Sequence, residues 1–440
     1  MKKITRREAL KVSGATATAL ALSSSANPGF AQGGGPSDIN SYFTSLRPYF
    51  PGKELLAADE MRITFLGTWF AERLSQACNS IFVELGNGDT FVFDCGPGVL
   101  AKYNAMGIPQ SKLDKVFLTH LHADHMTELG MLYGFGSSYK RMKPLYVWGT
   151  KPSGIPELGT GRIFDDGITA YCANLREAFR WHTESQSFLD SRLQNWIPPA
   201  WAPQDKVDSF DLVPFELDWR IEGGVAYHDK GVTITHFPSV HNRAGAIGYK
   251  LEWNGLSMIF TGDTKPNQYL IRAAKPGVDV LIHEMTTQPD VWCERFLGLH
   301  PGDPTWDQAL QVQKDIQQSS HTLDKAYGYI LNQIANAGIP PRLAVATHFP
   351  ASNDTIRPAL ANVRLWYPKG DFVITSDLMV LIVSKTSIQQ RRAVVSDYSW
   401  PPIVRLPAGT PAAAKYPNPT YQLDPAQLAQ TIDAAVYDTK

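Results

Sequence analysis

The sequence has few cysteines, no long apolar run and no excess of one charge. Its four cysteines, Cys78, Cys95, Cys172 and Cys293, show no CxxC spacing, so a disulfide is left open and buried thiols that pack as small apolar groups are favoured. No apolar run approaches the roughly 20 residues that span a bilayer, so no membrane span is expected. The net charge of −1 makes nucleic acid a poor candidate partner, because phosphate-backbone binding needs clustered Lys and Arg.

The chain also lacks a P-loop, a dinucleotide-binding glycine fingerprint and any short-period repeat. Its length of 440 residues and 43% hydrophobic content fit one large domain with a substantial core. We therefore expect loop insertions rather than a second fold.

The first 31 residues have the features of an export signal. A basic region is followed by a mild apolar stretch at 15–22 and by the small-x-small sequence Gly29-Phe30-Ala31. The segment 5–11 resembles a twin-arginine signal built on Arg6 and Arg7, with Ala9 where Phe is usual. We expect a signal peptide at 1–31, export by the twin-arginine pathway, and a periplasmic or secreted mature protein. A disordered basic tail is the alternative.

The most informative segment is 119–125, which follows the apolar run 116–118 and carries His120, His122, Asp124 and His125. Such a run is typical of a buried strand that opens into a loop. Imidazole nitrogens and a carboxylate oxygen suit zinc and neighbouring divalent metals. A histidine-rich polar loop without a metal is the alternative, but four ligand-type residues within six favour a metal site.

Three further ligand-type residues follow strand-like segments. His241 comes after 232–237, Asp263 after 257–260, and His348 ends the segment 343–348. Each alone is an ordinary core or loop residue, but together with the cluster they favour a two-metal site. Two metals need about seven ligands when one carboxylate bridges them, and the chain offers that number. The count favours hydrolysis with a metal-bridging hydroxide over a single structural zinc.

The chain resembles the metallo-β-lactamase superfamily, and within it the ribonuclease Z and arylsulfatase branch, from about Met61 to Ser384. The resemblance is carried, besides the cluster at 120–125, by the motifs Phe65-Leu66-Gly67-Thr68, Asn79-Ser80, Phe93-Asp94-Cys95-Gly96-Pro97-Gly98, His241 with Gly248-Tyr249, Gly262-Asp263-Thr264, His283-Glu284, Ser320-His321-Thr322 and Thr347-His348-Phe349. It implies an α/β fold, a four-layer αββα sandwich of two mixed β-sheets flanked by helices.

The resemblance also implies a site with two Zn²⁺ ions, with Mn²⁺ or Fe²⁺ as alternatives. One ion would be held by His120, His122 and His241, and the other by Asp124, His125 and His348, with Asp263 between them. The implied catalytic residues are Asp124, which orients the hydroxide and takes its proton, and His321, which is held by Glu284 and faces the leaving oxygen.

These features indicate an exported dinuclear-metal hydrolase that acts on a small-molecule ester of a tetrahedral anion, of the phosphodiester or aryl sulfate type. One alternative is a ribonuclease Z-type tRNA 3′-endonuclease, but its tRNA-gripping arm is absent, because 242–262 is only long enough for a hairpin at Asn254-Gly255. A lactone or β-lactam hydrolase is the other alternative. An oxygen-reducing di-iron protein would need Glu in place of His122, and a non-catalytic relative would be expected to have lost ligands. A homodimer is left open.

The expected organisation is an N-terminal extension at 32–60, a catalytic domain at 61–384 with insertions at 151–231 and 285–319, and a C-terminal extension at 385–440. Aromatic side chains crowd the segment 162–219, which is either a lid over the substrate or a packing element. We expect a hairpin at Asn87-Gly88 and helices at 124–136 and 321–337. Asp94 either orients a ligand histidine or serves as a turn residue.

Four other histidines are assigned to packing or surface positions: His182, His228, His236 and His300. Of these, His300 is the strongest candidate for an exception, because it lies in a Leu-His-Pro-Gly-Asp turn inside the second insertion.

Overall fold

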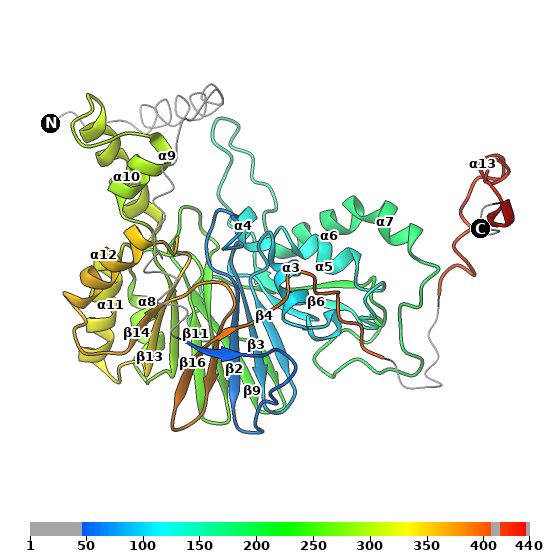
Figure 1. Ribbon diagram of the computed structural model, residues 1–440, viewed down its shortest axis with the longest axis horizontal. Helices are drawn as coiled ribbons and strands as arrows, with labels where there is room; N and C mark the ends of the chain where they lie inside the picture. Colours follow the sequence, from blue (N-terminus) through cyan, green and yellow to red (C-terminus); the bar gives the residue numbers. More distant parts are fainter. Residues whose placement is uncertain (1–45, 406–413, 437–440) are drawn as a thin grey trace.

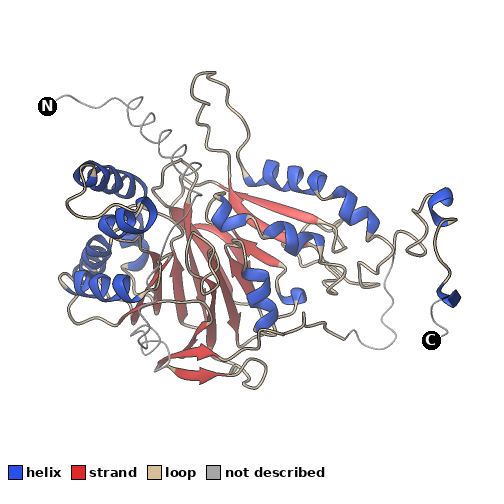
Figure 2. Ribbon diagram, turned by 45° about the horizontal axis from the view of Figure 1, so that its top comes forward, coloured by secondary structure: helices blue, strands red, loops and turns tan. Residues whose placement is uncertain are grey.

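The protein is described by a computed structural model that covers residues 46–405 and 414–436. The expected signal peptide at 1–31 lies outside the described residues. Within them, two mixed β-sheets lie face to face with helices on both outer sides, as Figures 1 and 2 show.

The first sheet has nine strands. Their order is β1 (Arg47–Tyr49), β16 (Ile388–Ala393), β15 (Met379–Val383), β2 (Met61–Gly67), β3 (Ser80–Leu85), β4 (Thr90–Phe93), β5 (Lys115–Phe117), β6 (Leu145–Thr150) and β7 (Leu212–Leu217). The second sheet has seven, in the order β14 (Phe372–Ile374), β13 (Leu343–Thr347), β12 (Val280–Glu284), β11 (Leu256–Phe260), β10 (Ile247–Trp253), β9 (Val232–Pro238) and β8 (Gly224–Asp229). The edge strand β1 and its neighbour β16 come from outside the segment 61–384.

The helices form two outer layers and one protruding pair. The first sheet carries α3 (Val99–Ala105), α4 (Ala123–Met126), α5 (Leu129–Gly134), α6 (Ile168–Ala178) and α7 (Arg180–Ser185), and the second carries α8 (Gln268–Ala274), α11 (Asp324–Ala337) and α12 (Asn353–Arg364). The pair α9 (Pro289–Leu297) and α10 (Trp306–Ser320) projects beyond the second sheet, and α13 (Pro425–Leu428) lies near the C-terminus. No described helix combines the length and the apolarity that a bilayer crossing needs.

The alternation of side chains along the strands explains the layers. In β11, Met258 and Phe260 join the apolar cluster between the two sheets, whereas Ile259 joins the cluster under α8 and α11. In β12 the pattern repeats, because Ile282 faces the other sheet and Leu281 faces the helices. Strands that are apolar on both faces must be covered on both faces. The predicted αββα sandwich is therefore confirmed.

Both predicted hairpins are present. The turn at Asn87-Gly88 joins β3 to β4, and the turn at Asn254-Gly255 joins β10 to β11. Asn254 and Gly255 have φ angles of 52° and 76°, the left-handed conformation that a tight two-residue hairpin requires. The segment 242–262 thus contains a short hairpin and no arm.

The helix predicted at 124–136 is interrupted. It forms the two short helices α4 and α5, because backbone groups between them form hydrogen bonds with the loop that follows β4. Cys95 donates its N–H to the carbonyl of His125, and the N–H of Glu128 donates to the carbonyl of Cys95 at 3.0 Å. Bonds to Cys95 thus replace part of the helical ladder between α4 and α5.

The helix predicted at 321–337 begins three residues later, at Asp324. His321 instead follows the last turn of α10, in extended conformation. The N–H of Thr286 donates to the carbonyl of Thr322 at 2.9 Å, so the segment 321–323 pairs with the chain that leaves β12. This pairing, which the helical spacing did not reveal, places His321 beside Glu284.

The first insertion is partly a packing element. It supplies β7 and β8, which extend the two sheets at one edge. The ring of Phe215 stacks on Trp148 at 4.7 Å, and Trp201 lies 5.6 Å from the same indole. These aromatic residues extend the core between the sheets, whereas Trp181 on α7 is exposed. For Trp201 and Phe215, packing against the core therefore explains the aromatic side chains without a lid over the substrate.

Candidate metal centre

The ligand-type residues meet at one edge of the sandwich because strands that run in the same direction end there. β11, β12 and β13 are parallel to one another, and β9 shares their direction because β10 is antiparallel to both β9 and β11. His241, Asp263 and His348 follow β9, β11 and β13, and His120 follows β5 of the facing sheet.

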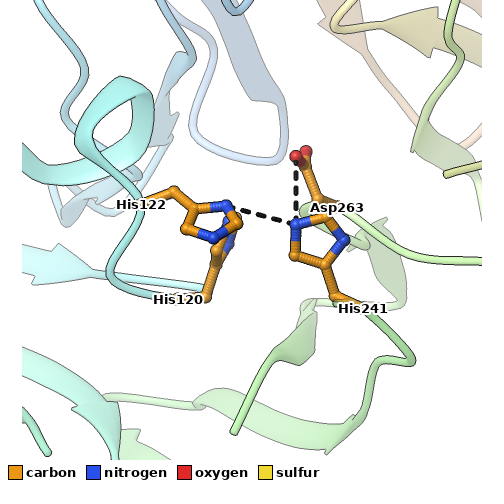
Figure 3. A group of neighbouring side chains, drawn as sticks. All are labelled: His120, His122, His241 and Asp263. Carbon is orange, nitrogen blue, oxygen red and sulfur yellow. Dashed lines mark hydrogen bonds and ion pairs between the residues drawn. The ribbon is translucent and has the colours of Figure 1, made fainter. Parts of the chain in front are cut away.

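The first group contains His120, His122, His241 and Asp263, and Figure 3 shows these side chains pointing toward one another. One donor atom of each lies within 4.8 Å of the others. The imidazole of His241 donates from Nδ1 to the carbonyl of Ser320 at 2.7 Å, which leaves Nε2 as an acceptor that faces His122. Burial lowers the pKa of the three imidazoles, that of His241 to about 4. The neutral form is the one that binds a metal.

The second group contains Asp124, His125, His348 and again Asp263, with donor atoms within the same 4.8 Å. His125 donates from Nδ1 to Asp94 at 2.7 Å, so its Nε2 faces Asp124 and Asp263 at 3.2 and 3.3 Å. Burial would lower the pKa of His125, but the three carboxylates raise it well above its usual value. Asp94 therefore orients a ligand histidine, as one of the two sequence-based interpretations held.

The residues present fit a pair of divalent cations. Nε2 of His120 is buried and has no hydrogen-bond partner, and the ion-pair contacts of the buried Nε2 of His125 and Oδ1 of Asp263 are to other members of the two groups. Buried polar atoms of this kind are rare unless something satisfies them. Three carboxylates packed around one imidazole also leave excess negative charge, which a cation would neutralise. Nitrogen and oxygen donors in this mixture suit zinc.

A third cluster joins Glu284, His321 and His348. His321 donates from Nδ1 to Oε1 of Glu284 at 3.0 Å, and the N–H of Thr264 donates to the same oxygen at 2.9 Å. Burial alone would lower the pKa of His321, but the carboxylates of Glu284 and Asp263 raise it to about 9. The structure thus brings together the Glu284–His321 pair that the resemblance implied, next to both groups.

Two backbone conformations at the centre are unusual. His348 has a φ of 60°, a conformation that costs free energy for a residue with a side chain and that clusters at functional sites. Gly262 has a φ of 56°, and a Cβ there would lie 2.5 Å from the side chain of Thr119, next to His120. Only glycine lets the strand end of β11 approach the strand end of β5 so closely.

The surroundings of the centre come from both insertions. A cavity of about 310 Å³ lies beside the first group and is lined by His120, His122 and His241 together with Lys151, Phe164, Asp166 and Arg243. Beside the second group, the ring of Phe70 lies 5.8 Å from that of His348 and stacks on Trp292 of α9. Composition and spacing alone do not single out the residues around the ligands, such as Phe70, Trp292 and Arg243, because their role depends on tertiary contacts.

Each of the other four histidines lies outside the three ligand clusters. The imidazole of His182 contacts the carbonyl of Gly134, and that of His228 contacts the hydroxyl of Thr233. His236 is buried within β9, and His300 is exposed in the turn between α9 and α10. No cluster of at least three metal-ligating residues in the described chain includes His300.

The sequence is similar to known protein families. A model of the metallo-beta-lactamase superfamily matches residues 75–134, and a model of the beta-lactamase superfamily domain matches 173–323. Ribonuclease Z of Mycobacterium bovis is 28% identical over 232 residues, which cover 51% of this chain and 69% of that protein. Ribonuclease BN of Cronobacter sakazakii is 29% identical over 271 residues, which cover 58% and 85%.

Two solved structures are similar over most of this chain, at low sequence identity. The metallo-beta-lactamase fold protein YhfI of Bacillus subtilis is 15% identical, with a TM-score of 0.48, and the match covers 74% of this chain and 100% of that one. The short form of human tRNase Z is 19% identical, with a TM-score of 0.43, over 72% and 98%. The sequence matches, the sandwich and the two ligand groups together place the chain in the metallo-β-lactamase superfamily, with distant homology to ribonucleases Z and BN.

Proposed function

We propose that the protein is an exported dinuclear zinc hydrolase that cleaves an ester of a tetrahedral anion, of the phosphodiester or aryl sulfate type. The observation that carries the proposal is the position of Asp263, which belongs to both ligand groups. A carboxylate shared in this way suits two ions held side by side, and paired ions clamp the attacking and leaving oxygens of a tetrahedral centre.

Two divalent ions in these groups would lower the pKa of water toward neutrality and withdraw charge from the substrate. Asp124 lies at the mouth of the site, with its side chain 21% exposed, and its Oδ2 is 3.3 Å from Nε2 of His348. A carboxylate that reaches both solvent and the centre can orient water and accept its proton.

His321 is the proposed proton donor. Its side chain is 23% exposed, and its Nδ1 is fixed by Glu284, so the rest of the ring is free to face a substrate. An imidazole held next to two carboxylates keeps its proton at neutral pH, and it can deliver that proton to a leaving oxygen. Thr264, which donates its N–H to Glu284, holds the pair in place from the strand end that also carries Asp263.

A ribonuclease Z-type endonuclease is the second candidate, because the curated relatives reported above are ribonucleases Z and BN. Against it stand the short hairpin at 254–255 and the net charge of −1. A long RNA substrate would need another basic surface in place of the arm.

A substrate screen with the purified mature protein tests the choice. The probes are bis(p-nitrophenyl) phosphate, p-nitrophenyl sulfate, an aliphatic lactone, a β-lactam and a tRNA precursor with a 3′ trailer. We expect turnover of one of the two chromogenic esters to exceed that of the other probes. Efficient 3′ trimming without turnover of either ester would reverse the ranking in favour of the endonuclease. Turnover of the lactone or the β-lactam alone would support a lactone or β-lactam hydrolase.

Export rests on residues 1–31 and has its own test. Replacing Arg6 and Arg7 with Lys should keep the full-length form inside the cell, because twin-arginine recognition depends on more than charge. Fractionation of cells that express each form measures this. Unprocessed wild-type protein in the cytosol would contradict the proposal.

A further inference from the structure

A continuous row of rings borders the second ligand group. Phe70, on the loop after β2, lies 5.8 Å from the ring of His348. Trp292 stacks on Phe70 at 5.5 Å with an interplanar angle of 18°, and Phe296 stacks on Trp292 at 3.9 Å. We call Phe70, Trp292 and Phe296 the aromatic wall. Trp292 and Phe296 belong to α9 of the second insertion, which Figure 1 shows beyond the second sheet.

The wall is accessible as well as close to the centre. Phe296 is 44% exposed, and Phe70 and Trp292 are half-buried. None of the three belongs to the three apolar core clusters, so core packing does not account for them. A row of partly exposed rings next to a catalytic centre is typical of a surface that binds an apolar or aromatic group.

The cavity beside the first group has a different character. Lys151 and Arg243 border it, and the guanidinium of Arg243 lies over the ring of Phe164 at 5.3 Å while it pairs with Asp166. The face of Phe164 that Arg243 covers is unavailable for stacking with a ligand. The two sides of the centre therefore differ, with charged groups beside the first ligand group and a row of rings that stack on one another beside the second.

We propose that the aromatic wall is the subsite for the organic arm of the substrate, and that this arm carries a flat aromatic ring. The inference rests on the proposed function, because it assumes that the two ligand groups hold the tetrahedral anion. Phe70, next to His348, would contact the ring nearest the ester bond, and Trp292 and Phe296 would contact its outer part. The three residues are specificity determinants and take no part in the bond-breaking step.

Phenylphosphonate and methylphosphonate test the wall, because both carry the same tetrahedral anion and only one carries a ring. Their dissociation constants are measured by titration calorimetry on the fully metallated protein. We expect phenylphosphonate to bind wild type about 10-fold more tightly, since stacking on a ring contributes roughly 2- to 10-fold. Trp292→Ala combined with Phe296→Ala should lower the ratio to the part that Phe70 alone contributes, and Trp292→Phe should restore most of the loss in place of Trp292→Ala.

Two further variants sharpen the result. Trp181→Ala removes an exposed indole on α7 of the first insertion and should leave the ratio unchanged. Phe164→Ala alters the cavity beside the first group and should also leave it unchanged. A ratio that falls in Phe164→Ala and persists in the double wall variant would overturn the inference and move the ring to the cavity. Equal binding of both phosphonates to wild type would overturn it as well.

Failure of the proposed function has a different signature. If neither phosphonate binds and no ester of the screen is hydrolysed by protein with two metals, both the function and the wall are contradicted. If methylphosphonate binds and esters are hydrolysed, but the wall variants change neither the ratio nor the KM for aryl esters, only the wall is contradicted. Melting temperature and metal content, measured for each variant, separate a binding effect from a folding defect.

Discussion

The ligand residues that follow the strands, here called the strand-end cluster, and the two insertions differ in how firmly their side chains are held. The ligand residues follow central strands, lie mostly buried, and are oriented by hydrogen bonds to buried neighbours, as when His125 donates to Asp94. The insertions at 151–231 and 285–319 border the same centre, but the side chains that they present to it are largely half-buried or exposed, such as Phe296 and Phe164. From this difference we infer that residues at the strand ends carry out turnover and that residues of the insertions select the substrate.

Each ligand residue at the strand ends is also held by more than one interaction. Thr119, for example, donates both its N–H and its hydroxyl to Asp94, which in turn accepts from His125. A chain of bonds of this kind fixes which ring nitrogen faces the metals, and loss of one member disturbs the others. Substitutions there should therefore have large effects on metals and turnover, while substitutions in the insertions should mainly affect binding.

Asp263→Ala should have the largest effect. Because this carboxylate belongs to both ligand groups, its loss should reduce metal content from close to two ions per chain and abolish turnover. Elemental analysis and an ester assay measure both quantities. Asp279→Ala is the matched control, since Asp279 precedes β12 of the same sheet and pairs with Arg342 instead. Active wild-type protein that contains one metal or none would refute the two-metal site.

His321→Ala should lower turnover by about 10² to 10⁴, the usual contribution of general acid–base assistance, with metal content near normal. Single-turnover kinetics and elemental analysis distinguish the outcomes. His182→Ala serves as the control, because the imidazole of His182 contacts the carbonyl of Gly134 and belongs to none of the three clusters. Substantial metal loss in His321→Ala would instead make His321 a ligand, as the third cluster with Glu284 and His348 also permits.

Glu284→Gln should lower turnover in the same way but less, since glutamine still accepts a hydrogen bond from His321 but lacks the negative charge. The double variant should be little worse than His321→Ala alone, because residues that act as a unit are non-additive. The same kinetic assay of both single variants and the double variant measures the coupling. Fully additive losses would show that Glu284 acts on the centre independently of His321.

Asp94→Asn should weaken metal binding about 10- to 100-fold, mainly at the second group, because Asp94 fixes the ring of His125. Competition with a chelator of known affinity measures it. Asp114→Asn is the control: Asp114 is another buried aspartate, at the start of β5, and its partners are Lys143 and Lys115. Burial would raise its pKa, but these two lysines lower it to about 2, so its loss should affect stability and not metal affinity. Equal metal affinity in both variants would contradict the orienting role of Asp94.

Much of this organisation could be predicted from the sequence, and the exceptions have a common cause. Apolar runs that end in ligand-type residues identified β5, β11 and β13, and the Asn-Gly pairs identified both hairpins, because these signals are local. The break between α4 and α5 depends on Cys95, and the extended conformation of 321–323 depends on Thr286. Contacts with distant segments determine these details, and they also determine the position of Phe70 beside Trp292. Such contacts cannot be predicted from local periodicity.

The smallest effect is expected where the first insertion contacts the loop after β9, and it tests how independent the insertion is of the ligand residues. Arg243 pairs with Asp166 at 2.7 Å, but its side chain is 40% exposed, so Arg243→Gln should change the free energy of unfolding by at most about 1 kcal/mol. Asp166→Ala should cost more, about 1 to 3 kcal/mol, because Asp166 also accepts the N–H and the hydroxyl of Ser153. Denaturant unfolding and elemental analysis should show two metals in both variants. Metal loss in Arg243→Gln would break the comparison, because the insertion would then help to hold His241, two residues away.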